Sequence, residues 1–295
     1  MENIEDIEIT SKLGDAQLKK GRKEGDNVIK LFFFLMNAFF SALIIFFFIY
    51  FNKGIIEAYT NTPELIWVTI IISLRVVIMF TFCYIMFRKW YAQEKRYLKN
   101  MPFLVGLFYY FSAIGKLLDI VIYIYYCSPY VDQGELLLLT KIRYFFLIIV
   151  FLPMLFLGLR PVLYNFGFNR GWDDKKVLRV RKEIITVYAC GFGVLIAIAT
   201  SIEFITYILA IMSIFTYISI WSIFRFAHKY KTFPSIRADI VSWGFLFYII
   251  SSSSRALLSL FLSNIFSWAQ IYAIGEILDF ISITIIFFGF VLKSK

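Results

Sequence analysis

The chain has 295 residues, of which 60% are hydrophobic and 17% are charged, and its mean hydropathy is +0.76. Soluble globular proteins have an apolar content of about 45–50%, so this composition excludes a soluble fold. The charges lie in blocks between apolar runs that are long enough to cross a bilayer. This pattern predicts an all-α, polytopic integral membrane protein.

The first 27 residues form a charged segment with seven acidic residues and five Lys or Arg. They contain no apolar core of the kind found in signal peptides, so we expect residues 1–27 to be a disordered cytoplasmic arm. About 20 mainly apolar residues cross the roughly 30 Å of hydrocarbon in a bilayer. By that measure the sequence predicts eight spans: 28–51, 65–87, 102–126, 136–159, two within 184–224, 236–262 and 265–292. Tight turns near Glu203 and at Ser263-Asn264 separate the spans of the last two pairs.

Basic residues are distributed unequally between the two sets of connectors. Lys and Arg are concentrated in 88–101, 160–183 and 225–237, whereas the opposite set carries Lys53 and otherwise acidic residues. Because cytoplasmic loops hold an excess of Lys and Arg, this pattern predicts that both termini are cytoplasmic. The net charge of +10 then reflects topology and attraction of the cytoplasmic loops to anionic lipids, and we expect no nucleic-acid partner.

The third and seventh spans resemble each other at an offset of 139 residues, at which Lys116 aligns with Arg255. The alignment favours a 4+4 arrangement of parallel repeats, as in many transporters. The alternative is a coincidence of composition, because the fourth and eighth spans align poorly. The predicted organisation is an N-terminal arm at 1–27, a first half at 28–159, a basic connector at 160–183 and a second half at 184–295.

Two residue types predict local helix packing. Gly191 and Gly193, in the fifth span, are typical of close helix–helix contact or of a thin helix beside a cavity. Pro153, in the fourth span, predicts a kink.

Ionisable residues lie inside the predicted spans, between the bilayer centre and the outer surface. A charge at the centre of a span costs about 2.5–3.5 kcal/mol on insertion scales, so it usually faces the bundle interior or an aqueous cavity. Helical spacing aligns the polar residues of the third, seventh and eighth spans into stripes. The candidate ligand-binding residues are Arg75, Tyr109, Ser112, Lys116, Asp119, Tyr248, Ser251, Arg255, Glu276 and Asp279.

These residues predict an outward-facing polar cavity. Glu276 and Asp279 are the expected partners of Arg255 and Lys116. Two further cations, Lys141 and Arg143, lie close enough to the outer end to extend toward the surface, and counting them gives a cationic surplus. The surplus favours a small anionic or zwitterionic ligand.

Two classes of function fit this pattern, and a third is disfavoured. The chain is either a transporter or sensor of a small solute, or a non-catalytic scaffold or signalling partner whose charges form structural ion pairs. The basic and aromatic connector 160–183 contacts lipid headgroups or docks a cytoplasmic protein. Catalysis is least favoured because the sequence lacks the common catalytic and nucleotide-binding motifs.

Metal and cofactor sites are not expected, and no catalytic residues are assigned. The cysteines, Cys83, Cys127 and Cys190, have no metal-binding spacing, and the single histidine, His228, lies in a basic connector. A lipid-modifying enzyme that uses membrane carboxylates is the remaining enzymatic alternative. It is disfavoured because carboxylates paired with cations make poor general acids.

Overall fold

A computed structural model describes residues 29–50, 52–94, 96–168, 170–233, 235–262 and 267–292, without the side chains of 209, 210, 254–262 and 268. All regular structure in these ranges is helical. The chain divides into two compact units, Met1–Asn52 and Lys53–Lys295. In the first unit, the described part is essentially one apolar helix, Ile29–Tyr50.

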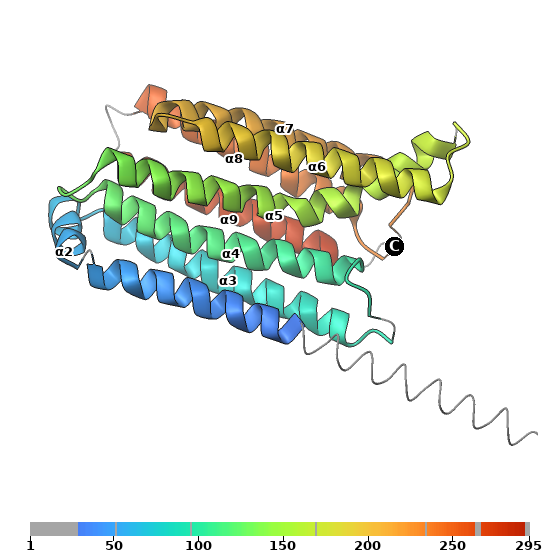
Figure 1. Cartoon of the computed structure of the whole chain (residues 1–295), viewed down its shortest axis with the longest axis horizontal. Helices are drawn as coiled ribbons and strands as arrows, with labels where there is room; N and C mark the ends of the chain where they lie inside the picture. The colour runs from blue at the N-terminus through green and yellow to red at the C-terminus, as the bar shows by residue number, and fades with distance from the viewer. Residues whose placement is uncertain are drawn as a thin grey trace, which may run out of the picture. The chain divides into compact units, whose positions relative to one another are not determined.

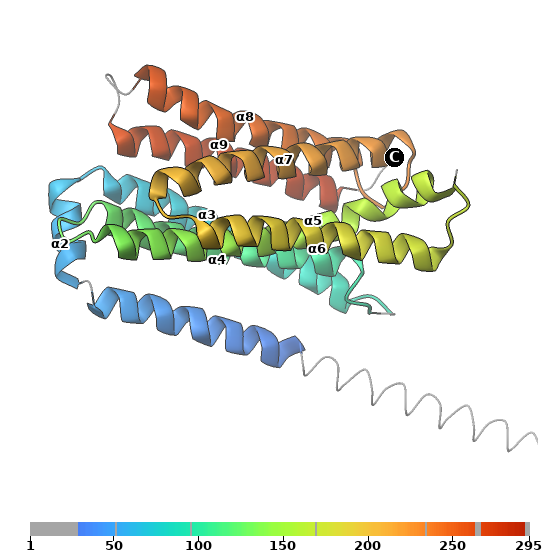
Figure 2. The ribbon, with the colours of Figure 1, turned by 45° about the horizontal axis from the view of Figure 1, so that its top comes forward.

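The second unit contains seven long helices, which run along its long axis with reversals at both ends (Figures 1 and 2). A short helix, α2, leads into them. The bounds are α2 Asn52–Asn61, α3 Leu65–Tyr91, α4 Met101–Tyr126, α5 Gln133–Phe168, α6 Asp174–Ile198, α7 Ile202–Lys229, α8 Ala238–Leu262 and α9 Trp268–Val291.

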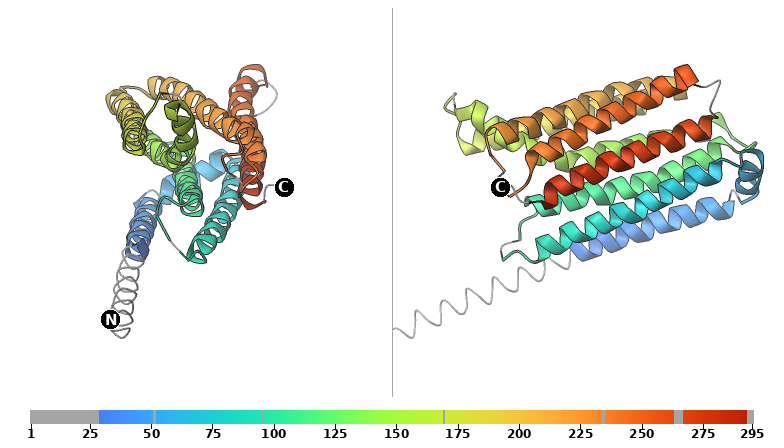
Figure 3. Two further views of the ribbon diagram at one scale, coloured as in Figure 1. Left: turned by 90° about the vertical axis from the view of Figure 1, so that its right-hand side faces the viewer. Right: turned by 180° about the vertical axis from the view of Figure 1, so that it is seen from behind.

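Six of these long helices form a closed ring. α3 packs on α4, α4 on α5, α5 on α7, α7 on α8, α8 on α9, and α9 packs back on α3. The end-on view in Figure 3 shows this order. α6 lies outside the ring and packs mainly against α5. The ring therefore has an interior to which six helices contribute, while much of α6 faces outward.

Six described helices are long and apolar enough to cross a membrane: Ile29–Tyr50, Leu65–Tyr91, Met101–Tyr126, Gln133–Phe168, Ile202–Lys229 and Ala269–Val291. The chain is a multi-pass integral membrane protein. α6 and α8 are not among these six. α6 begins with a charged turn, and the apolar part described in α8 is the shorter segment Ala238–Ser253. The count of eight spans, the repeat and the side on which the termini lie stay predictions.

The predicted connector 160–183 is mostly helical. α5 continues through Pro161 to Phe168, and α6 begins at Asp174. A proline removes one helical hydrogen bond, but burial of Leu163 and Gly167 stabilises the extended helix. The turn between the helices uses a positive φ at Gly171 and a cap in which Asp173 accepts a hydrogen bond from the backbone N–H of Lys176. The helical structure of this connector was not predicted, because these packing contacts are not visible in the sequence.

The predicted turn at Glu203 is displaced. The chain reverses at Ala199–Ser201, and Glu203 lies in the first turn of α7. A carboxylate is favoured there by the helix dipole, and Ser201 caps the helix by accepting from the N–H of Phe204. The second predicted turn, Ser263-Asn264, lies outside the described residues.

Among the described helices, α8 and α9 approach each other closely through two glycines. A Cβ at Gly289 would lie 2.7 Å from the backbone nitrogen of Val241, and a Cβ at Gly244 would lie 2.9 Å from that of Ile286. A Cβ at Gly191 would meet nothing within 4 Å in the described residues. The prediction of close packing was therefore wrong at Gly191, which faces outward, whereas a Cβ at Gly193 would lie 3.5 Å from the ring of Phe145 on α5.

Candidate functional site

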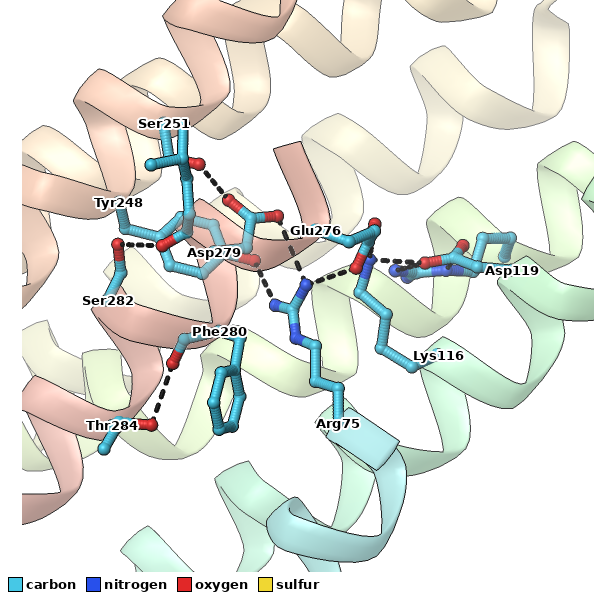
Figure 4. A network of polar contacts seen from close by, with 12 residues as sticks. Arg75, Lys116, Asp119, Tyr248, Ser251, Glu276, Asp279, Phe280, Ser282 and Thr284 are labelled. Carbon is cyan, nitrogen blue, oxygen red and sulfur yellow. Dashed lines mark hydrogen bonds and ion pairs between the residues drawn. The ribbon is translucent and has the colours of Figure 1, made fainter. Parts of the chain in front are cut away.

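A network of buried charges joins the helices of the ring, and Glu276 of α9 is at its centre (Figure 4). The Glu276 Oε2 atom accepts from Nη1 of Arg75 at 2.5 Å, and its Oε1 atom accepts from Nζ of Lys116 at 2.7 Å. The side chains of Arg75 and Glu276 are 1% and 0% exposed. One carboxylate thus joins α3, α4 and α9.

The network extends along α9 to Asp279. Its Oδ2 lies 3.4 Å from Nη1 of Arg75, and its Oδ1 accepts from the hydroxyl of Ser251 at 2.6 Å. The other terminal nitrogen of Arg75, Nη2, donates to the hydroxyl of Tyr248 at 3.2 Å. Two residues of α8 are thereby connected to the same ion-pair cluster.

The other branch runs from Lys116 to α5. Nζ of Lys116 lies 2.9 Å from Oδ2 of Asp119, one turn further along α4. Arg143 holds the Asp119 carboxylate with two bonds, from Nε at 2.5 Å and from Nη2 at 3.1 Å. The paired geometry is the strong form of an Arg–carboxylate contact.

Within the described side chains, three cations balance three carboxylates: Arg75, Lys116 and Arg143 against Asp119, Glu276 and Asp279. A buried charge that loses its partner is strongly destabilising, whereas a paired and hydrogen-bonded one is tolerated. The mutual pairing explains how helices of such apolar composition hold these groups away from water.

A small cavity of about 30 Å³ adjoins the network inside the ring. All six ring helices contribute to its wall, which is formed by Arg75, Met79, Phe108, Ser112, Lys116, Arg143, Leu147, Val150, Phe151, Tyr217, Phe245, Tyr248 and Ile283. The lining is unequal in charge. Among the described residues it includes all three cations of the network and none of its three carboxylates. The space is enough for one or two water molecules.

Two guanidinium nitrogens beside this cavity have hydrogen-bonding capacity left. Nε of Arg75 and Nη1 of Arg143 are buried and have no hydrogen-bond partner among the described residues. Gly115 provides the room for Arg143, since a Cβ there would lie 3.3 Å from Nη1. Unused donors in a buried site can bind an additional acceptor.

The structure brings together most of the sequence-predicted site residues. Arg75, Lys116, Asp119, Tyr248, Ser251, Glu276 and Asp279 share the network, and Ser112 lines the cavity. Tyr109 is buried, but its hydroxyl donates to the carbonyl of Ile283 at 3.3 Å and thus joins α4 to α9. The Arg255 side chain lies outside the described residues.

Two expectations about the charges need correction. The predicted pairing of Lys116 with a carboxylate of α9 is confirmed at Glu276, but Arg75, which was not an expected partner, binds both Glu276 and Asp279. Arg143 turns inward to Asp119, whereas Lys141, two residues earlier, donates to the carbonyl of Ala197 at 3.0 Å. A two-residue step turns a helical side chain by about 200°, so the two cations cannot face the same way.

Sequence reasoning missed Tyr217 of α7 as a cavity residue. Its ring packs against those of Phe151, at 5.0 Å, and Tyr248, at 4.6 Å. One isolated tyrosine in an apolar helix carries no periodic signal. No group of three or more His, Cys, Asp or Glu in the described part of the chain is placed to hold a metal ion.

Comparisons of the chain with protein-family models, with curated proteins and with solved structures give no match. The class of protein therefore follows from the chain itself. It is a multi-pass membrane protein with salt-bridged charges buried in its helical ring.

Proposed function

We propose that the protein binds a small anionic or zwitterionic solute at the cavity inside the helical ring, as a transporter or a sensor. The observation that carries this proposal is that the cavity is lined by the cations of the network and not by its carboxylates. Three cations and the hydroxyls of Ser112, Tyr217 and Tyr248 border the space, whereas the three compensating carboxylates do not.

The electrostatics of this arrangement favour an anionic group. Cations that are buried in a medium of low dielectric attract an anion more strongly than solvated ones do. The unused donors on Arg75 and Arg143 supply hydrogen bonds to it. A zwitterionic solute would bind there through its anionic group.

The size of the cavity sets a further condition. A space of about 30 Å³ holds an anionic group but not a whole metabolite, so a larger solute enters only when ring helices separate. Such a motion suits a transporter, in which helices rock around a central site. It also suits a sensor, in which the separation is transmitted to the connectors.

A second candidate is a scaffold or signalling protein whose buried charges only fix the packing. It is favoured by the closed pairing, since each carboxylate oxygen of Asp119, Glu276 and Asp279 has a cationic or hydroxyl partner. Interhelical polar contacts often serve this purpose alone. We assign no catalytic role to the site in either case.

The test is a thermal-shift titration of the detergent-purified chain with sodium acetate, phosphate and glycine at constant ionic strength. A binding solute stabilises the folded protein by RT ln(1 + [L]/Kd), which is about 2.7 kcal/mol at 100 Kd. Ser112→Ala and Tyr217→Phe remove cavity hydroxyls without breaking an ion pair. We expect both to weaken the stabilisation.

Ser282→Ala is the matched control. Ser282 is buried on α9, but its hydroxyl bonds to the carbonyl of Leu278 in the same helix, and it does not line the cavity. It should leave binding unchanged. If none of the three probes stabilises the protein and the cavity variants change only its stability, the scaffold role is favoured. For any probe that binds, uptake into proteoliposomes separates transport from sensing.

A further inference from the structure

The exposed face of α6 differs from the faces of the ring helices. The residues of α6 that are buried, Val177, Arg181, Tyr188 and Ile196, lie on the side toward α5 and α7. The opposite side carries three exposed cations in the first turns, namely Lys175, Arg179 and Lys182. These cations border a shallow groove of about 580 Å³ together with Leu178, Thr186 and Val187.

Beyond the cations the exposed surface of the helix is apolar, on a face turned by about 120° from them at 100° per residue. Val187, Val194 and Ile198 are exposed at steps of seven and four residues, and Gly191 lies between them. Within the described residues nothing approaches within 4 Å of a Cβ at Gly191. From Val187 to Ile198 the helix rises about 16 Å, which is close to half of the roughly 30 Å hydrocarbon thickness.

We propose that the exposed surface of α6 binds one anionic phospholipid, which crosses from the cations to the apolar face at Val187. The headgroup phosphate lies on Lys175, Arg179 and Lys182, and an acyl chain follows Val187, Gly191 and Val194 toward Ile198. The order along the helix, cations first and then one leaflet of apolar surface, matches the order of groups in a phospholipid. Lipid-facing basic side chains at helix ends are suited to headgroup contact.

Charge distinguishes an anionic lipid from a zwitterionic one. Glu183 is the single acid in the groove, and it lies 3.8 Å from Arg179 in a pair whose side chains are 81% and 63% exposed. The face therefore keeps two positive charges in excess. A zwitterionic headgroup brings no net charge to balance them, whereas phosphatidylglycerol brings one negative charge. Each Lys or Arg near an anionic lipid surface contributes about a factor of five in affinity.

The experiment is native mass spectrometry of the full chain released from detergent, titrated with phosphatidylglycerol or with phosphatidylcholine of the same acyl chains. A third arm uses glycerol phosphate, which has the anionic group without the chains. We expect one phosphatidylglycerol to be retained at least about tenfold more tightly than phosphatidylcholine, since two excess cations are involved. Glycerol phosphate should not bind measurably.

A pair of double variants tests the position of the site. Lys175→Gln with Arg179→Gln should weaken phosphatidylglycerol binding by about 25-fold, at about fivefold per cation. The matched control, Arg225→Gln with Lys229→Gln, removes one Arg and one Lys at the same four-residue step from exposed positions at the end of α7. It should leave lipid binding unchanged, and both doubles should keep the melting temperature of the parent.

Several results would overturn the proposal. If phosphatidylglycerol and phosphatidylcholine are retained equally, the site does not select an anionic headgroup. If glycerol phosphate binds as tightly as phosphatidylglycerol, the site binds a phosphate group and not a lipid. An equal loss in the α7 control assigns the effect to overall charge. If the protein is a dimer that shows no preference between the lipids, and the Lys175→Gln, Arg179→Gln variant dissociates it, the exposed surface of α6 binds a second copy of the chain.

Discussion

Two Arg–Glu pairs in this protein have the same chemistry and opposite surroundings. Arg75 and Glu276 are 2.5 Å apart inside the ring, with side chains 1% and 0% exposed. Arg179 and Glu183 are 3.8 Å apart on the outer side of α6, with side chains 81% and 63% exposed. The environment of a charge in this protein, and not its residue type, therefore decides what it contributes to stability.

The difference follows from the packing of the helices. The ring excludes solvent from its interior, so a charge there depends on its partners, and the loss of one partner leaves the other uncompensated. On α6 each charge keeps its own access to water or headgroups, and its neighbour changes little. The same cation can therefore be essential to folding in one region and available for binding in the other.

The largest expected effect is at the centre of the buried network. Glu276→Gln keeps the shape of the side chain but removes the charge that compensates Arg75 and Lys116. We expect a loss of roughly 3–5 kcal/mol in the free energy of unfolding, measured by reversible unfolding in mixed micelles. Glu183→Gln, on α6, is the control and should change stability by less than about 0.5 kcal/mol.

A double-mutant cycle then isolates the pair. If Arg75→Gln is introduced with Glu276→Gln, the combined loss should be smaller than the sum of the single losses, because each single variant already breaks the contact. Strictly additive losses would show that the two side chains do not interact in the folded protein.

The next prediction compares two glycines. Gly289→Ala places a Cβ 2.7 Å from the backbone nitrogen of Val241, so α8 and α9 must separate, and we expect a loss of roughly 1–3 kcal/mol. Gly191→Ala enters open space and should stabilise α6 by up to about 1 kcal/mol, because alanine is the better helix former. The same unfolding assay measures both. A similar cost for both variants would contradict the described difference in helix approach.

The sequence predicts much of this fold because membrane insertion imposes simple rules. Apolar length locates the helices, and the cost of an intramembrane charge predicts that Arg75, Lys116 and Glu276 face inward. The pairing of Lys116 with Glu276 was predicted, but that of Arg75 with both carboxylates was not, because pairing depends on helix adjacency. In the ring, α3 packs beside α9, and this contact between the two helices allows Arg75 to form its ion pair with Glu276.

Helix adjacency also explains the failures at single residues. Gly191 and Gly289 look alike in the sequence, yet only Gly289 faces a neighbouring backbone, since α6 lies outside the ring and α9 within it. Arg143 and Lys141 are equally near a helix end, and the rotation of α5 turns only Arg143 toward Asp119. Position along a helix can be predicted from sequence, whereas its rotation depends on contacts from other helices.

A comparable effect separates two buried serines. Ser251→Ala removes the donor to Asp279 Oδ1, and hydrogen bonds to charged groups contribute about 1.5–3 kcal/mol. Ser282→Ala removes a hydrogen bond to a backbone carbonyl of its own helix. Its loss in the free energy of unfolding should be only a small fraction of the loss for Ser251→Ala. Unfolding of the two variants under one set of conditions checks the order. A larger loss for Ser282→Ala would mean that Asp279 does not depend on α8.

The smallest expected effect is the coupling between Arg179 and Glu183. Exposed pairs at this spacing contribute about 0.3–0.5 kcal/mol, and an Arg that precedes its Glu is the less favourable order in the helix dipole. A double-mutant cycle at low salt should give a coupling at or below this range, and at 1 M salt it should vanish, since the screening length falls to about 3 Å. The Arg75–Glu276 coupling should persist at 1 M salt because bulk salt screens a buried pair much less than an exposed one. If both couplings fell together with salt, the interior of the ring would be open to water, and the contrast between the two pairs would be one of distance and not of burial.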